Sequence, residues 1–339
     1  MMRVRNIYRG HRRSDFSRSL VTTLSARSCN MDESISTNNS LVTPEWVVAR
    51  LKAPSVKILD ATWYLPNAGK NGLAEFKVDR VPGSSFLDLD GIADTSKAGL
   101  PHMLPSSEAF SAAMDALGIQ KSTHVVLYDR AGIFSAPRAW WTFRIFGHEN
   151  VSVMEGGLPA WRSLGLPLET EEIVDDVIMG PTKAARSVPP PAAQYKASLG
   201  ASKVRNIDQM MANIDSKEEV VVDARPLGRF LGKEPEPRAG LRGGHMPGAR
   251  SLPFPSVLES GPVGSRFKSP EELRTVFSGA GVQLDGSQQV VGSCGSGMTA
   301  CILALAAYQT TGNLMAVYDG SWMEWGGRQD TPVTTEPMH

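Results

Sequence analysis

The sequence has few cysteines, no net charge and no long apolar run, and each shortage excludes a class of protein. Three cysteines among 339 residues cannot form a disulfide framework. Lys plus Arg and Asp plus Glu both total 35, so the whole chain carries no charge that favours nucleic acid or an anionic membrane. The chain contains no run of about 18 apolar residues, which is the length needed to cross a bilayer. With 41% hydrophobic residues, the composition predicts a reduced, globular protein with room for two domains.

The neutral total hides a basic N-terminal segment. Residues 1–28 contain seven arginines and several serines, but only one acidic residue, Asp15. An arginine-rich, acid-poor stretch without a continuous apolar core is typical of an organellar transit peptide rather than a secretory signal. We therefore expect residues 1–30 to be a targeting peptide for mitochondria. A plastid protein and a cytoplasmic protein with an uncleaved tail remain the alternatives.

The rest of the chain contains a near-copy of itself. Five pairs of segments match at an offset of 163 to 165 residues: "VKILDATW" with "EVVVDARP", "RVPGSSFLDLD" with "HMPGARSLPF", "LPSSEAFSAAMDALGI" with "KSPEELRTVFSGAGV", "THVVLYDRAGIFSAPRAWW" with "QQVVGSCGSGMTACILAL", and "NVSVMEGGLPAWR" with "NLMAVYDGSWMEW". Chance similarity would not keep so constant an offset. A fixed period of this kind indicates two copies of one structural unit.

Each copy alternates short β-branched runs with helical segments, and "SSEAF" and "SPEEL" are typical helix starts. The pattern predicts an α/β fold of two tandem domains, each a mainly parallel sheet with helices on both faces. We expect the first domain over residues 40–166, an extended acidic and proline-rich linker over 167–203, the second domain over 204–328 and a tail over 329–339.

The segment "VVGSCGSGMTACILAL" places a cysteine between a buried strand and an apolar helix. Backbone N–H groups of the loop and the positive end of the helix favour a thiolate at Cys294. Gly295 and Gly297 let the loop curl, while Ser296 and Thr299 add hydroxyl donors. The sequence therefore predicts a nucleophilic cysteine. Cys301, inside the apolar helix, is predicted to be a core residue.

The loop itself has no basic side chain, and position 300 is Ala, where a cysteine phosphatase would need an arginine. Basic groups lie instead in "DARPLGRFLGKEPEPRAGLRGGHMPGA". A guanidinium suits bidentate capture of a carboxylate, so Arg229 and Arg238 are candidate substrate ligands. The alternative is an ion pair of either arginine with Glu234 or Glu236.

Taken together, the repeat and the motifs "GRFLGKEPEPR", "GHMPGA", "CGSGMTAC" and "YDGSWMEW" resemble the rhodanese superfamily, in particular its tandem-domain 3-mercaptopyruvate sulfurtransferases. The resemblance covers about residues 40–328. It implies a non-catalytic first domain, a catalytic second domain and an active site in the crevice between them. The implied reaction moves sulfur from 3-mercaptopyruvate through a cysteine persulfide to a thiol acceptor such as thioredoxin or glutathione, or to cyanide, and releases pyruvate.

The resemblance also implies roles for individual residues, with no metal or other cofactor. Catalysis is assigned to Cys294 as the persulfide former, with Ser296, Asp90 and His102 as a proton relay. Substrate binding is assigned to Arg229, Arg238, Gly295, Gly297, Met298 and Thr299. Met298 stands where valine is frequent in the family.

In the first domain, Asp129 takes the place of the cysteine and Arg80 that of His245, so that half is expected to be structural. Trp140, Trp141, Trp322 and Trp325 are predicted to be core residues. Two other functions remain open: a thiosulfate:cyanide sulfurtransferase, which should carry cations in the loop after the cysteine, and a non-catalytic sulfur carrier, which needs no carboxylate clamp.

Overall fold

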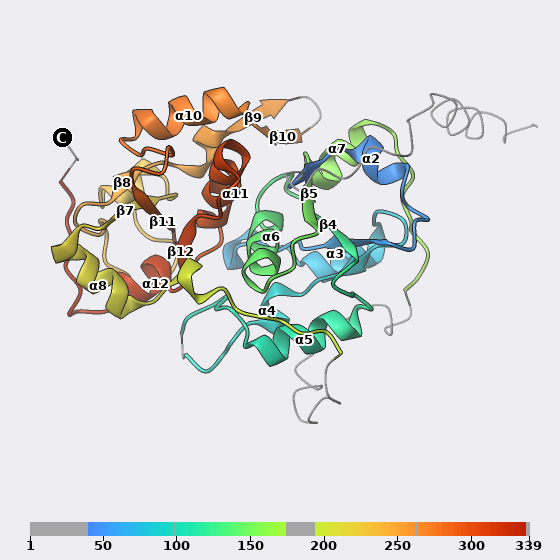
Figure 1. Ribbon diagram of the computed structural model, residues 1–339, viewed down its shortest axis with the longest axis horizontal. Coiled ribbons are helices and arrows are strands. Elements are labelled where there is room, and N and C mark those ends of the chain that lie inside the picture. Colours follow the sequence, from blue (N-terminus) through green and yellow to red (C-terminus); the bar gives the residue numbers. More distant parts are fainter. Residues whose placement is uncertain (1–39, 98, 174–193, 262–263, 337–339) are drawn as a thin grey trace, which may run out of the picture. The chain divides into compact units, whose positions relative to one another are not determined.

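The computed structural model describes residues 40–97, 99–173, 194–261 and 264–336, and in them the same sheet occurs twice (Figure 1). The predicted targeting peptide, residues 1–30, lies outside the described residues. In the first half, five parallel strands are arranged in the order β1-β5-β4-β2-β3. They are β1 (Leu41–Val42), β2 (Val56–Asp60), β3 (Ser85–Phe86), β4 (His124–Tyr128) and β5 (Val151–Met154).

The second half repeats this order strand for strand, as β6-β12-β11-β7-β8, again with parallel pairing. The strands are β6 (Val204–Arg205), β7 (Glu219–Asp223), β8 (Arg250–Ser251), β11 (Gln289–Ser293) and β12 (Ala316–Tyr318). An antiparallel hairpin of β9 (Leu258–Gly261) and β10 (Gly264–Phe267) is added to this half. The predicted α/β fold with two copies of one unit is confirmed.

Helices cover both faces of each sheet. Neighbouring residues of a strand point to opposite faces, so the apolar residues of one strand pack against helices on both sides. In the first half, Ile58 and Val126 pack with α2 (Pro44–Val48) and α7 (Gly157–Ser163), whereas Leu59 and Val125 pack with α5 (Ser107–Ala116) and α6 (Ala136–Ile145). In the second half, α8 (Ile207–Ser216), α9 (Leu227–Phe230) and α12 (Ser321–Trp325) cover one face, and α10 (Pro270–Gly279) and α11 (Ala300–Thr311) the other.

The short elements that remain lie in the connections: α3 (Gly72–Val78), α4 (Leu89–Ile92), and the 3₁₀ turns η1 (Pro66–Ala68), η4 (Ala201–Lys203) and η5 (Phe254–Val257). Two predicted helix starts are confirmed. Ser106 caps α5 by accepting from the N–H of Ala109 at 3.1 Å, and Ser269 forms a capping box with Glu272 at the start of α10. Over the described part of the chain, no helix is long and apolar enough to cross a membrane.

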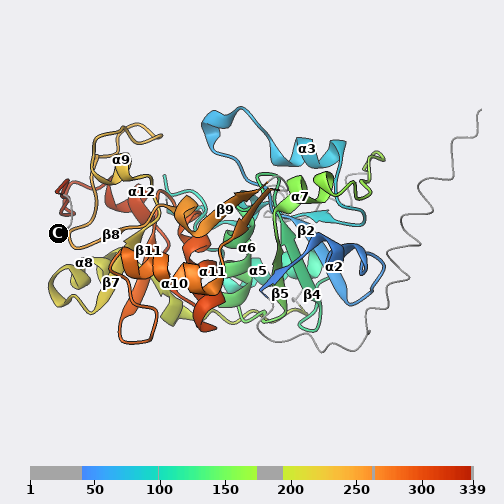
Figure 2. The ribbon, with the colours of Figure 1, turned by 90° about the horizontal axis from the view of Figure 1, so that it is seen from above.

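The two halves share one hydrophobic cluster, at whose centre α6 lies beside α11 (Figures 1 and 2). Trp140 packs edge-on against Tyr308 with ring centroids 5.2 Å apart, and the indole N–H of Trp141 donates to the carbonyl of Met315 at 3.2 Å. Helix α11 is buried along almost its whole length, which explains why "ACILALAAY" is apolar on every side. All four tryptophans predicted to be core are fully buried.

In each half, a residue that precedes the edge strand forms an isolated bridge with a residue that follows the last helix of that half. Arg80 forms an antiparallel bridge with Glu169 in the first half, and His245 forms the equivalent bridge with Thr334 in the second. Arg80 therefore does occupy the position of His245. The ring of His245 is fully buried, stacks on Phe230 at 3.6 Å and bonds its carbonyl, which is a structural arrangement.

The end of the predicted linker runs along the first half. The backbone N–H groups of Gln194 and Tyr195 donate to the carboxylate of Asp115 at 2.7 and 2.8 Å. Tyr195 also bonds its hydroxyl to Nδ1 of His148 at 2.9 Å, while Nε2 of that histidine lies 3.0 Å from the carbonyl of Thr123. These contacts satisfy a neutral imidazole, which donates to Thr123 and accepts from Tyr195. The linker is thus anchored through a buried neutral histidine.

The burial of His148 predicts a loss of stability in acid. Burial lowers the pKa of His148 from 6.5 to about 4, so below pH 6.5 the unfolded chain binds a proton that the folded chain binds only near pH 4. We expect His148 to account for a loss of about 3 kcal/mol in unfolding free energy between these values. Urea unfolding of wild type and His148→Gln at pH 7 and pH 4.5 measures this share. An identical pH dependence of the two proteins would contradict it.

Candidate active site

The predicted nucleophile lies at the carboxyl end of the second sheet. Strand β11 ends at Ser293, Cys294 follows with only 1% of its surface exposed, and α11 begins six residues later. Helix α12 holds the loop in place. The backbone N–H of Cys294 donates to Oγ of Ser321 at 3.2 Å, and the Cys294 carbonyl accepts from the N–H of Trp322 at 3.0 Å. The predicted unit of a buried strand, a cysteine loop and an apolar helix is confirmed.

The first half shows what the loop geometry can bind. At the position of Cys294 it has Asp129, whose carboxylate accepts from the N–H groups of Ala131, Phe134, Ser135 and Ala136 at 2.8 to 3.0 Å. The loop is therefore a cradle of backbone donors around an anion. In the second half, no described residue accepts from the N–H groups of residues 295–299. Among the second-half equivalents of the donors to Asp129, the N–H groups of Ser296 and Thr299 have no acceptor in the described part of the chain, whereas that of Cys301 donates to the carbonyl of Met298 at 3.2 Å.

The loop glycines are required by close neighbours. Gly297 has φ +76°, and a Cβ there would lie 2.9 Å from the carbonyl oxygen of Asp319. A Cβ on Gly295 would lie 3.2 Å from Nη2 of Arg229. The Arg229 guanidinium thus lies against Gly295, and a side chain at this position would have to displace it slightly.

Arg229 is held by an acidic neighbour. Its Nε donates to Glu236 at 3.1 Å, and its Nη2 forms an ion pair with the same oxygen. The Glu236 side chain is 2% exposed and also pairs with Arg225 at 2.8 Å, which in turn pairs with Asp223 at the end of β7. The predicted alternative, an ion pair of Arg229 with Glu236, is therefore present, and it fixes the guanidinium beside the loop.

Arg238 is different, because it forms no hydrogen bond or ion pair with any described residue. Burial, together with repulsion from Arg229, lowers the pKa of Arg238, whereas the charges of Cys294 and Asp90 act in the opposite direction. The guanidinium therefore lies in the electric field of the cysteine and of the first half at once. A partly buried cation without a carboxylate partner is suited to an anionic ligand.

The first half contributes a histidine and an acid. Asp90 on α4 forms an ion pair with Nδ1 of His102 and accepts from the indole N–H of Trp63 at 2.9 Å. Burial would raise the pKa of Asp90, but the bonds from His102 and Trp63 outweigh it and lower the pKa. His102 has φ +61° and a side chain only 3% exposed, and its Nε2 is buried without a partner. The Asp90–His102 link of the predicted relay is formed.

The remaining predicted residues lie in different surroundings. Ser296 is buried, yet its hydroxyl is not bonded to Nε2 of His102, so the structure does not form that link of the predicted relay. Met298 is 2% exposed and packs in the central hydrophobic cluster. Thr299 lies at the N-terminus of α11 without capping it. Cys301 is fully buried, and burial raises its pKa to about 12, as expected of a core residue.

Sequence reasoning missed Trp63, Arg138 and Asp319. Arg138 is buried and bonds to Asp319, to the His102 carbonyl and to the Gly297 carbonyl. A signal for it was present, since "SAPRAWW" places an arginine in an otherwise apolar segment. Its partners lie 36 to 181 residues away along the chain, so no local pattern indicated them.

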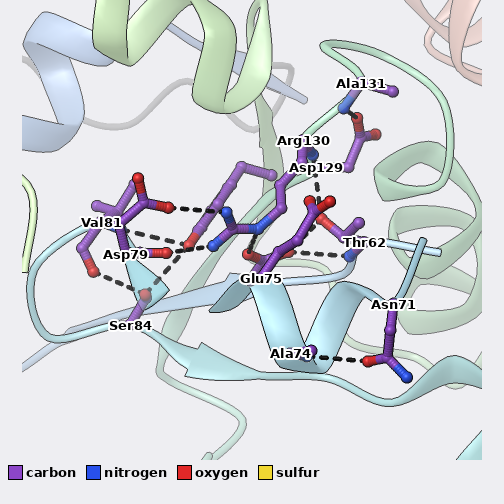
Figure 3. Close-up of polar contacts among 12 residues, drawn as sticks. Thr62, Asn71, Ala74, Glu75, Asp79, Val81, Ser84, Asp129, Arg130 and Ala131 are labelled. Carbon is purple, nitrogen blue, oxygen red and sulfur yellow. Dashed lines mark hydrogen bonds and ion pairs between the residues drawn. The ribbon is translucent and has the colours of Figure 1, made fainter. Parts of the chain in front are cut away.

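The equivalent edge of the first sheet is filled by the protein's own charges (Figure 3). Arg130 donates to Asp60 at 3.0 Å and to Asp79 at 2.9 Å, and Asp79 also pairs with Arg162 at the surface. Burial raises the pKa of Asp60 to about 6 despite the attraction of Arg130. At this edge Arg130 is paired with two carboxylates, and Asp129 occupies the cradle of backbone donors.

Comparisons with known proteins agree with this architecture. The family model of the rhodanese-like domain matches twice, over residues 43–164 and 206–328. The chain is 40% identical over 308 residues to "Thiosulfate/3-mercaptopyruvate sulfurtransferase 1, mitochondrial" of Arabidopsis thaliana, covering 88% of this chain and 79% of the relative. It is also 40% identical over 292 residues to the 3-mercaptopyruvate sulfurtransferase of Homo sapiens, covering 84% and 91%.

Among solved structures, the crystal structure of SseA from Escherichia coli, described with the rhodanese fold of 3-mercaptopyruvate sulfotransferases, superimposes with a TM-score of 0.69 at 32% identity. The superposition covers 84% of this chain and 99% of SseA. Two copies of one sheet, a cysteine loop in the second copy and two matches to the same domain family lead to one conclusion. This chain belongs to the rhodanese family, as a member with two tandem domains.

Proposed function

We propose that the protein is a 3-mercaptopyruvate sulfurtransferase whose active site combines Cys294, Arg229 and Arg238 with Asp90 and His102. The observation that carries the proposal is Arg238, a partly buried guanidinium that has no carboxylate partner among the described residues and lies in the field of Cys294. 3-Mercaptopyruvate brings a carboxylate, a keto group and a thiol on three adjacent carbons. Binding its carboxylate and keto oxygens to the arginines would direct its sulfur toward the cysteine.

The charge around the cysteine favours a substrate with one negative charge. Arg225 and Arg229 are balanced by Asp223 and Glu236, which leaves Arg238 as the cation in excess. Thiosulfate is a dianion, and residues 295–297 bring no further positive charge. The thiosulfate:cyanide reaction therefore remains the second candidate. A sulfur carrier without catalysis is less favoured, because it would not need a buried clamp for a carboxylate.

The reaction proceeds in two half-reactions. The Cys294 thiolate attacks the thiol sulfur of 3-mercaptopyruvate, an S–S bond forms, and the C–S bond breaks with its electron pair going to carbon. The resulting pyruvate enolate takes up the proton lost from the thiol and leaves as pyruvate. An acceptor thiolate, such as that of thioredoxin or glutathione, or cyanide then attacks the outer persulfide sulfur and releases the Cys294 thiolate.

His102 is the group available to move that proton. Asp90 fixes its Nδ1, so the buried Nε2, which has no partner, can accept from the substrate thiol and donate to the enolate carbon. Ser296, buried in the cysteine loop, would enter this path once substrate fills the site. The open N–H groups of residues 295–299 would stabilise the negative charge on the persulfide.

The first prediction concerns the nucleophile. Cys294→Ser should abolish turnover of 3-mercaptopyruvate, because a serine hydroxyl cannot form a persulfide. Intact-mass analysis of wild type after donor treatment should show one added sulfur, mapped to Cys294. Cys301→Ser is the matched control, since a serine can keep the contact that Sγ of Cys301 makes with the Gly297 carbonyl. Added sulfur at Cys301, with none at Cys294, would refute the assignment.

The second prediction concerns the unpaired cation. Arg238→Met should cost about 2–4 kcal/mol in kcat/KM for 3-mercaptopyruvate, mainly through KM, because a carboxylate would lose its only uncompensated cation. Arg238→Lys should recover part of the loss, since a single ammonium cannot reproduce the planar fork. The same steady-state kinetics are measured with thiosulfate in parallel, so that kcat/KM for the two sulfur donors can be compared. An unchanged KM for 3-mercaptopyruvate in Arg238→Met would show that the substrate binds elsewhere.

The third prediction concerns location. We propose mitochondrial import, supported by the seven arginines of residues 1–28 and by the mitochondrial label of the Arabidopsis relative. A fluorescent fusion of residues 1–35 should enter mitochondria, and the same fusion with its arginines replaced by glutamine should stay in the cytosol. Equal cytosolic signal from both fusions, or import into plastids, would contradict the proposal.

A further inference from the structure

Arg138 is a cation at the junction of the two halves. It lies in the first turn of α6, its side chain is 3% exposed, and its guanidinium reaches three separate segments. Nη2 donates to Oδ1 of Asp319 and to the His102 carbonyl, both at 2.6 Å, and Nη1 donates to the Gly297 carbonyl at 3.3 Å. One side chain of the first half therefore bonds to the cysteine loop of the second half and to the histidine of its own half.

Asp319 completes this arrangement from the second half. It follows β12, at the same carboxyl edge of the sheet as Cys294, and is 5% exposed. Its Oδ2 accepts from the N–H of Leu104 at 2.9 Å, so it holds the first-half segment that carries His102. Burial acts to lower the pKa of Arg138, but the charge of Asp319 outweighs burial and raises it. The Arg138–Asp319 pair joins the two halves at the site.

The backbone at both contact points is unusual. Gly297 and His102 have φ of +76° and +61°, and both use their carbonyl oxygens to accept from Arg138. A Cβ on Gly297 would lie 3.1 Å from Nη1 of Arg138, so the loop rests directly against the guanidinium. A non-glycine residue in the left-handed region has to be held there by its surroundings. The bond from Arg138 to the His102 carbonyl is one of the contacts that hold this backbone.

We propose that Arg138 and Asp319 are positioning residues of the sulfur-transfer reaction: they set the cysteine loop and His102 at a fixed separation. The proposal rests on the proposed roles of Cys294 and His102. Neither residue of the pair needs to touch substrate. The consequence is that the pair should govern the rate of proton and sulfur transfer, whereas Arg229 and Arg238 govern substrate binding. A pair that only joined the domains would affect stability alone.

A matched control exists in the first half. Arg130 is also a buried arginine, 4% exposed, and it is paired with Asp60 at 3.0 Å and Asp79 at 2.9 Å. All its partners among the described residues belong to the first half, at the edge that Asp129 occupies (Figure 3). Arg130→Lys should therefore lower stability as much as Arg138→Lys does, without a route to the cysteine loop.

The experiment compares Arg138→Lys, Asp319→Asn and Arg130→Lys in the full chain. Lysine keeps the positive charge of Arg138 but cannot reach Asp319, Gly297 and His102 together. For Arg138→Lys we expect kcat with 3-mercaptopyruvate and 2-mercaptoethanol to fall on the order of 100-fold, as a misplacement of about 1 Å can cause, with KM changed less than about threefold. The pH dependence of Cys294 alkylation by iodoacetamide should also differ from wild type. For Arg130→Lys, kcat and the alkylation profile should match wild type.

Asp319→Asn keeps the shape of the side chain and decides the question if Arg138→Lys does not fold. It should show the same loss in kcat with an unchanged KM. If the folded variants of the pair keep a kcat within about threefold of Arg130→Lys at equal melting temperature, the positioning role is refuted. The Cys294→Ser variant separates a failure of the proposed function from a failure of the positioning role of Arg138 and Asp319. Residual turnover in that variant would refute the proposed function, whereas its inactivity leaves the comparison above to judge the pair.

Discussion

The packing of α6 against α11 is the contact on which the rest of the structure depends. Each helix covers one face of its own sheet, and because both are apolar where they meet, the two sheets share one hydrophobic cluster. Trp140, Trp141 and Tyr308 fill the contact. Since α11 begins at the cysteine loop and α6 carries Arg138 in its first turn, the contact that stabilises the protein also brings the site together.

The two halves use one loop geometry for different purposes. In the first half the cradle of backbone donors is satisfied by the carboxylate of Asp129, and the neighbouring edge is filled by Arg130 and its acidic partners. In the second half a cysteine replaces the carboxylate, and the N–H groups of residues 295–299 have no acceptor among the described residues. A buried donor without a partner destabilises a fold, so these donors are suited to an anionic ligand.

Charge at the site is balanced by ion pairs between residues that lie close together along the chain. Glu236 fixes Arg229 over Gly295 and is shared with Arg225, which leaves Arg238 as the uncompensated cation. Across the junction, Asp90 holds one ring nitrogen of His102 and leaves the other buried and unpaired. In the proposed reaction, this arrangement places one positive charge for a monoanion beside Cys294 as nucleophile and His102 as proton carrier, which belong to different copies of the same fold.

The sequence alone determined the two-copy α/β architecture, the helix starts at Ser106 and Ser269 and the strand–cysteine–helix unit, because these depend on periodicity, caps and spacing within short segments. The constant offset of the repeat also showed that Asp129 occupies in the first half the position that Cys294 has in the second. Only the tertiary structure decided that Arg229 is paired and Arg238 is free, that Ser296 is not bonded to His102, and that Arg138 meets Asp319, Gly297 and His102. Arg229 and its partner are only seven residues apart, but the sequence left that pair as one alternative among several. Gly297 and Asp319 lie 159 and 181 residues from Arg138, and they meet it because α6 of the first half packs against α11 of the second.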